Sequence, residues 1–161
     1  MLSLSLDGVE ALDAKLSAYP DTLTASLGKA ADRLAAALVD KIVGEKLSGG
    51  LLQAGTGALA ASIAADVAVD SDGIGVTVGS SGVKYAAIQE YGGKTPAHEI
   101  LPVKGQALAF VVDGARRFAR IVQHPGSQIP ERSYLRSSLA EMSDQILDAF
   151  SEAANDSWSQ S

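Results

Sequence analysis

The sequence predicts an α+β fold: a small antiparallel or mixed β-sheet packs against a long helix in the N-terminal half and an amphipathic helix near the C-terminus. Apolar residues recur every three or four positions over residues 21–46 and again over residues 134–154, the periodicity of helices with one buried face. Between these stretches, β-branched residues alternate with small or polar ones, which favours strands. A sheet followed by a helix completes an α+β layout.

The first residues have the pattern of a strand or an extended arm. Leu2, Leu4 and Leu6 alternate with two serines, which is the period of a half-buried strand. The Asp7-Gly8 pair then predicts a turn. We therefore expect residues 1–8 to form an N-terminal arm or an edge strand.

Two helices are expected before residue 47. The first covers residues 9–18, with Val9, Leu12 and Leu16 on one face. It is expected to stop at Pro20, because proline removes a backbone donor and pushes the residue before it away from helical dihedrals. The second helix covers residues 21–46 and carries one apolar stripe, and its many alanines favour helix and close packing on a sheet.

The middle of the chain alternates between strands and loops. Residues 63–69 and 74–78 predict a hairpin, and a short helix over residues 86–91 ends at a glycine pair. Strands are expected near residues 100–103, 107–112 and 118–122, with Asp113-Gly114 turning between the last two. Loops are expected over residues 47–57, 80–84, 92–99 and 123–131, and loops held on a scaffold commonly carry contacts.

The last helix is predicted over residues 134–154, with Ser133 as its N-cap. Residues 155–161 are expected to be a flexible tail in which Trp158 is either frayed or an anchor for a neighbour. The domain prediction is thus one α+β domain over residues 1–154, followed by this tail.

Composition limits the function classes. The chain has 161 residues, enough for one domain with a real core, and no cysteine, which excludes disulfides and thiolate metal sites. No segment reaches the roughly 20 apolar residues of a bilayer span, so we expect no membrane contact. The net charge of −6 divides into −5 over residues 1–83, +4 over 84–136 and −5 over 137–161. This layout argues against a general nucleic-acid binder and suits head-to-tail protein contacts.

Catalytic motifs are weak. Gly55-Thr56-Gly57 begins a loose dinucleotide-like pattern but lacks the preceding strand that such a site needs, so we interpret it as a glycine-rich connection. His98 and His124 lack the usual metal-ligand spacing, and His124 is expected to hydrogen-bond within a His124-Pro125-Gly126 turn. Glu90 and Glu99 are interpreted as solvated or salt-bridged surface acids.

The arginines of the basic middle segment have three open interpretations. Arg116, Arg117 and Arg120 lie in a strand region, and Arg132 and Arg136 follow the His-Pro-Gly turn. They are expected to meet the acids of a neighbouring subunit, to remain solvated on a polar sheet face, or to contact a phosphate backbone.

Four short pieces, in this order, resemble a known family. They are Glu90-Tyr91-Gly92-Gly93, Ile100-x-Pro102, His124-Pro125-Gly126 and Arg132-x-x-Leu135. The pattern resembles the tail-component (tail-completion or neck) family of long-tailed double-stranded-DNA phages and prophages. The chain departs from it at Ser133-Tyr134, where the family often has proline-phenylalanine.

The resemblance implies a structural virion protein and not an enzyme, with no cofactor and no metal. It implies a ring of subunits in the phage neck that completes the tail and joins it to the DNA-filled head. The implied partners are copies of itself, the head–tail connector, and tail-tube or tail-terminator proteins, with DNA passing nearby at most and without sequence-specific binding. The expected location is the virion, after assembly in the host cytoplasm.

Two alternatives stay open: a tail terminator that caps the tube, and a small cytoplasmic enzyme that gathers His98, His124 and Glu90 in a pocket. The candidate subunit or partner contacts are Leu2, Leu4, Leu6, Arg116, Arg117, Arg120, His124, Arg132, Arg136 and Trp158.

Overall fold

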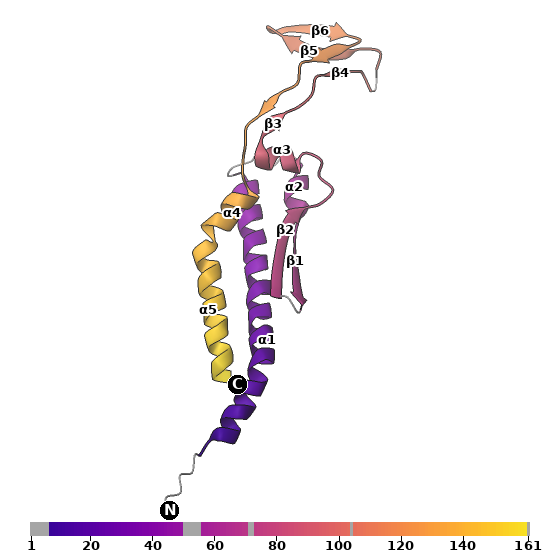
Figure 1. Cartoon of the computed structure of the whole chain (residues 1–161). Coiled ribbons are helices and arrows are strands. Elements are labelled where there is room, and N and C mark those ends of the chain that lie inside the picture. Colours follow the sequence, from indigo (N-terminus) through magenta and orange to yellow (C-terminus); the bar gives the residue numbers. More distant parts are fainter. Residues whose placement is uncertain (1–6, 50–55, 71–72, 104, 161) are drawn as a thin grey trace, which may run out of the picture. The chain divides into compact units, whose positions relative to one another are not determined.

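The computed structural model describes residues 7–49, 56–70, 73–103 and 105–160, and it has an α+β fold (Figure 1). The chain divides into two compact units where the sequence predicted one domain over residues 1–154. Unit 1 comprises Met1–Lys84 and Ser133–Ser161, and unit 2 comprises Tyr85–Arg132. The predicted arm with Leu2, Leu4 and Leu6 lies outside the described residues.

Unit 1 is built on one long helix, α1 (Val9–Lys41), which runs without a break through Pro20. The predicted interruption at Pro20 is therefore wrong. Pro20 and Leu16, whose carbonyl loses its helical donor, are both exposed, so water can bond the freed oxygen. Tyr19 is held in the helix because its ring packs edge-on against Trp158, with centroids 5.3 Å apart.

The end of α1 widens into a π-helical segment, η1 (Ile42–Leu47), in place of the single helix predicted to residue 46. The predicted C-terminal helix is likewise divided, into α4 (Leu135–Glu141) and α5 (Ser143–Gln160). The division falls at Met142, whose backbone is non-helical at φ −98° and ψ 0° and whose N–H is shared between the carbonyls of Ser138 and Leu139.

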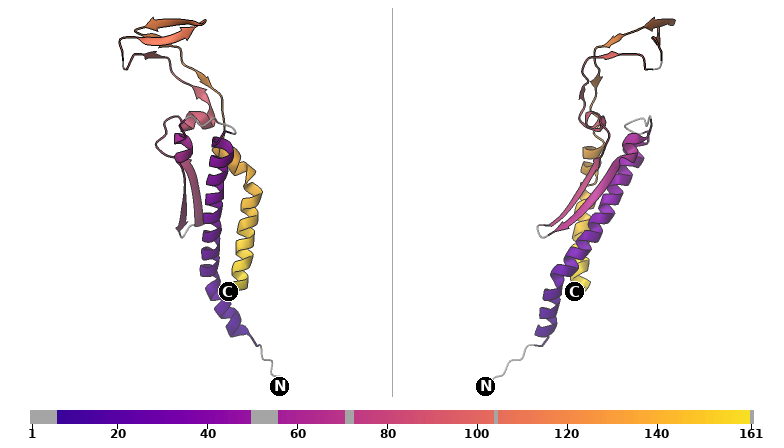
Figure 2. Two further views of the ribbon diagram at one scale, coloured as in Figure 1. Left: turned by 180° about the vertical axis from the view of Figure 1, so that it is seen from behind. Right: turned by 90° about the vertical axis from the view of Figure 1, so that its right-hand side faces the viewer.

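The C-terminal residues continue α5 instead of forming the predicted tail from residue 155. Ala153 and Ser157 are buried, and Trp158 contacts α1. The helix continues because its apolar face still has α1 to pack on. In Figures 1 and 2, α5 and the β1–β2 hairpin lie along different sides of α1.

The hairpin prediction is confirmed: β1 (Ile63–Asp70) pairs antiparallel with β2 (Gly73–Ser80), and a short helix, α2 (Ala58–Ala61), precedes it. Gly57 caps α2, and η1 is the preceding element among the described residues. Residues 50–55 of the predicted glycine-rich connection lie outside the described residues. One buried core joins these elements, and it comprises Ala30, Ala31, Leu34, Ala35, Leu38, Ile42, Leu47, Leu59, Ile63, Tyr134, Met142 and Ala153.

Unit 2 begins with α3 (Ala86–Tyr91), as predicted, and continues as three separate antiparallel pairs. The pairs are β3 (Gly93–Lys94) with β8 (Gln128–Ile129), β4 (His98–Ile100) with β7 (Val122–His124), and β5 (Leu108–Val112) with β6 (Ala115–Ala119). Across the described ranges, no helix is long and apolar enough to cross a bilayer.

Candidate functional site

The two segments expected to be loops in unit 2 pair with each other. Residues 92–99 and 123–131 contribute the β3–β8 and β4–β7 ladders. Between the ladders, the Thr95 N–H donates to the Ser127 carbonyl at 2.9 Å, and the Ser127 N–H donates to Thr95 Oγ1 at 2.7 Å. We call residues 92–100 with 122–131 the ribbon, and it brings the Tyr-Gly-Gly and His-Pro-Gly pieces of the sequence side by side.

Two glycines of these pieces stand where the ribbon strands approach too closely for a side chain. Gly92 has φ +69°, and a Cβ there would lie 2.7 Å from the Glu131 nitrogen. Gly126 has φ +86°, and a Cβ there would clash with the Thr95 carbonyl oxygen. Both positions therefore require glycine, because the backbone is left-handed there and a side chain would not fit. These two glycines allow the two strands of the ribbon to approach and pair.

The two histidines face each other across the β4–β7 ladder. His98 and His124 are register partners, and their rings stack with centroids 4.9 Å apart and planes 24° from parallel. The Gly126 N–H donates to His124 Nδ1 at 3.0 Å, which confirms the predicted hydrogen bond within the turn and leaves the proton of a neutral His124 on Nε2. His98 Nδ1 lies 3.2 Å from the Pro96 carbonyl, so it is the donor there.

The carboxylates near the histidines differ from each other. Glu99 is exposed and accepts a hydrogen bond from Gln123 Nε2 at 2.7 Å, as expected of a surface acid. Glu90 is only 2% exposed, so its interpretation as a surface acid is wrong. It lies on α3, next to the exposed Tyr91.

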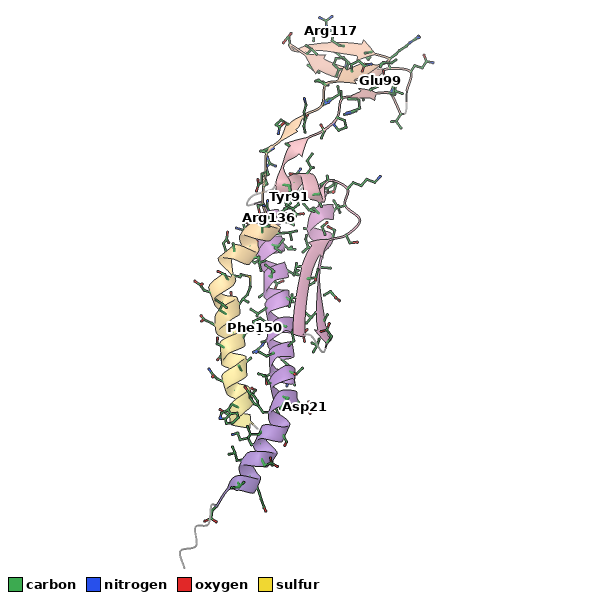
Figure 3. All side chains as sticks on the ribbon, in the orientation of Figure 1. Asp21, Tyr91, Glu99, Arg117, Arg136 and Phe150 are labelled. Atoms are coloured by element: carbon green, nitrogen blue, oxygen red, sulfur yellow. The ribbon has the colours of Figure 1, made fainter. Side chains whose placement is uncertain are left out.

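Three of the five arginines of the sequence prediction gather on and beside the β5–β6 hairpin. Arg116 and Arg117 lie on β6, Arg120 follows it, and all three are exposed (Figure 3). The turn is Asp113-Gly114, as predicted, with φ of +52° and +76°, which matches a type I′ hairpin turn. Exposed apolar side chains lie among the arginines, and they are Phe110, Val111, Val112 and Phe118.

The remaining candidate contacts are dispersed. His124 belongs to the ribbon, and Arg132 ends unit 2, where its backbone N–H donates to the Gln89 carbonyl at 2.9 Å. Arg136 lies exposed on α4. Trp158 is an internal anchor, packed against Tyr19 with Lys15 Nζ 4.9 Å from its ring centroid, although it remains 43% exposed.

An ion cluster that the sequence did not reveal joins α1, η1 and α4. Lys41 contacts Glu45 at 2.8 Å and Glu141 at 3.0 Å, and Lys46 contacts Glu141 at 2.6 Å. Hydrogen bonds from Lys46 and then Lys41 lower the pKa of Glu141, while Glu45 and then Glu141 raise the pKa of Lys41. The Lys41–Glu45 spacing of four signals one of these contacts; the other two join residues far apart in sequence.

Two surface hollows lie in unit 1. One, of about 430 Å³, is lined by the ion cluster and Met142. The other, of about 460 Å³, is lined by residues that include Leu23, Leu27, Ile74 and Phe150. Neither includes His98, His124 or Glu90. Within the described ranges, no three His, Asp or Glu side chains are grouped so that they could hold a metal ion.

Comparisons of the chain with protein-family models, curated proteins and solved structures gave no match.

Proposed function

We propose that this protein is a structural component of the neck of a long-tailed double-stranded-DNA phage or prophage. In this role it completes the tail and joins it to the DNA-filled head as part of a ring of subunits. Its partners are then copies of itself, the head–tail connector, and tail-tube or tail-terminator proteins. The proposal includes location in the virion.

The observation that carries the proposal is the closing of the ribbon by the residues of the family-like pattern. Gly92 and Gly126 lie on opposite strands of the ribbon, and each accepts a backbone approach that excludes a side chain. Their pattern therefore has a structural reason, and that reason is the assembly of a surface element, not of a catalytic pocket. A sequence pattern that shapes an exposed element is expected in a protein that functions by binding other subunits.

Charge supports the same proposal. Unit 2 carries the basic segment of the chain, while both segments of unit 1 are acidic. A chain with separate acidic and basic surfaces suits ordered contact between subunits, and the chain's overall negative charge disfavours a DNA-binding role.

The test is electron microscopy of particles from a host that carries a deletion of the gene. Filled heads separated from tails of normal length would support the joining role, and overlong tails would indicate the tail terminator instead. Normal infectious virions would contradict both and return attention to an enzyme.

Complementation links the test to the ribbon. A plasmid copy with Gly126→Ala is expected to fail in the deletion strain, because the new Cβ meets the Thr95 carbonyl. Gly114→Ala is the matched control, since Gly114 has a similar φ but open space around it. If both copies restored titre equally, the ribbon would not matter for assembly.

A further inference from the structure

The most exposed face of the β5–β6 hairpin is apolar and basic. The register places Val111 opposite Arg116 and Ala109 opposite Phe118, so these side chains share one face. Val111 is 68% exposed and Phe118 is 67% exposed. A two-stranded hairpin is at best marginally stable alone in water, and an exposed apolar face with arginines is typical of protein interfaces. We call this surface the hairpin face.

The first turns of α1 carry an apolar stripe bordered by acidic side chains, where the hairpin face is apolar and basic. Val9, Leu12 and Leu16 form one stripe and are each about half exposed. Glu10 and Asp13 border that stripe one turn apart, and every residue from 7 to 14 is exposed. We call this surface the helix stripe.

The helix stripe lies in line with the part of α1 that packs against α5 within unit 1. Tyr19, three residues after Leu16, is covered by Trp158 near the end of α5. Beyond that point α1 extends past the end of α5 (Figure 2). An apolar partner on this end of α1 therefore removes half-exposed apolar side chains from water, which stabilises the helix end.

The two surfaces complement each other in charge. Residues 7–16 contain three acids and one base, for a net charge of −2, whereas residues 105–121 contain three arginines and one aspartate, for a net charge of +2. Identical copies that each carry two different, complementary surfaces associate head to tail, and such contacts close into rings when the rotation between copies allows it.

We propose that the hairpin face of one copy docks on the helix stripe of a second copy of this chain. Phe118 and Val111 cover the stripe of Val9, Leu12 and Leu16, and Arg116 meets Glu10 or Asp13. The ring closure rests on the proposed neck function. The contact itself is a property of the purified protein, so it can fail while the gene deletion still separates heads from tails, and it can hold while the deletion has no effect.

The first experiment is sedimentation of the full chain over a wide concentration range with three double variants. The hairpin variant is Arg116→Glu with Val111→Glu, two positions that oppose each other on the hairpin face. The helix variant is Glu10→Lys with Asp13→Lys. The control is Asp144→Lys with Asp148→Lys, which changes two exposed acids of α5 by the same total charge as the helix variant. All six positions are exposed, and circular dichroism verifies that each variant folds.

The wild type and the control are expected to associate. Each test variant is expected to associate about tenfold or more weakly, because like charges then face each other. An equal mixture of the two test variants is expected to regain association, since each reversed surface finds a reversed partner. The proposal would be overturned if the wild type were monomeric or if neither variant weakened association. It would also be overturned if the variants lost association and their mixture did not regain it. If only the hairpin variant lost association, the hairpins of two copies would pair with each other, and the helix stripe would not be the partner of the hairpin face.

Cross-linking distinguishes contact between copies from contact within one. Because the chain contains no cysteine, Leu12→Cys in one tagged chain and Val111→Cys in another introduce single thiols. A disulfide between the two tags is expected under mild oxidation. Leu147→Cys replaces Leu12→Cys as the control, since Leu147 is 66% exposed on α5. Equal yields for both pairs would overturn the proposed contact.

Discussion

Different interactions stabilise the interior of each of the two units of this protein. Unit 1 packs alanines and aliphatic side chains of α1 between α5 and the β1–β2 hairpin, whereas among the described residues of unit 2 only Ala86 and Glu90 are buried. Unit 2 depends instead on backbone hydrogen bonds between short strands and on glycines that permit close approach. A unit with little apolar burial opens locally at low free energy and keeps its apolar side chains available for partners.

Truncation of a core residue in unit 1 should have the largest effect. Ile42 is fully buried, so Ile42→Ala is expected to lower the free energy of unfolding by about 2–5 kcal/mol, through lost burial and a cavity. Urea unfolding at a concentration where the protein is monomeric measures this loss.

The matched truncation in unit 2 is Phe118→Ala. Phe118 is largely exposed, so the change is expected to stay within about 0.5 kcal/mol. Similar losses for the two variants would show that the contrast between the units is not real.

Substitution of Gly126 should open unit 2 and leave unit 1 intact. Gly126→Ala places a Cβ against the Thr95 carbonyl at a left-handed backbone position, which costs about 1–2 kcal/mol for conformation alone and more for the clash. Hydrogen exchange at the Thr95 and Ser127 amides is expected to lose protection, while amides of α1 keep theirs. Gly114→Ala should cost only the conformational part. Unchanged protection in Gly126→Ala would contradict the role of glycine in closing the ribbon.

The sequence predicted well those elements whose signal is local. The stripe over residues 21–46, the helix that ends at Gly92 and the turn at Asp113-Gly114 all depend on residues close together in the chain. The β1–β2 hairpin was predicted for the same reason, because β-branched residues flank its turn.

What sequence reasoning missed depends on contacts between distant segments. β3 and β8 have two residues each, too short to show alternation, and they form because residues 92–95 meet residues 127–131. Pro20 was a local signal that the packing of Trp158 on Tyr19 overrides. The basic character of the β5–β6 hairpin was visible in its arginines, whereas the exposure of Val111 and Phe118 required the register.

Removal of the Trp158 side chain tests whether the C-terminal segment belongs to unit 1. Trp158→Ala deletes an edge-on contact with Tyr19 and the neighbouring Lys15 ammonium, so it is expected to lower the free energy of unfolding by about 1–2 kcal/mol. Trp158→Phe keeps a ring in place and should lose less. Thermal unfolding of both variants measures the difference, and a loss that is equal to zero in Trp158→Ala would restore the flexible tail that the sequence predicted.

The smallest expected effect concerns the ion cluster, because its side chains are partly solvated and exposed ion pairs contribute little. The pKa of Glu141 lies below its ordinary value of 4.5 in the folded protein, so its contribution is complete above the unfolded pKa and is lost as the pH falls through the folded pKa. The raised pKa of Lys41 has the opposite sign: its contribution is complete below 10.5 and is lost as the pH rises through the folded value. We expect Glu141→Gln to lower the melting temperature slightly at neutral pH and to match the wild type in strong acid. A difference that stayed constant as the pH fell through the acid range would show that the variant acts through packing near Met142 and not through charge.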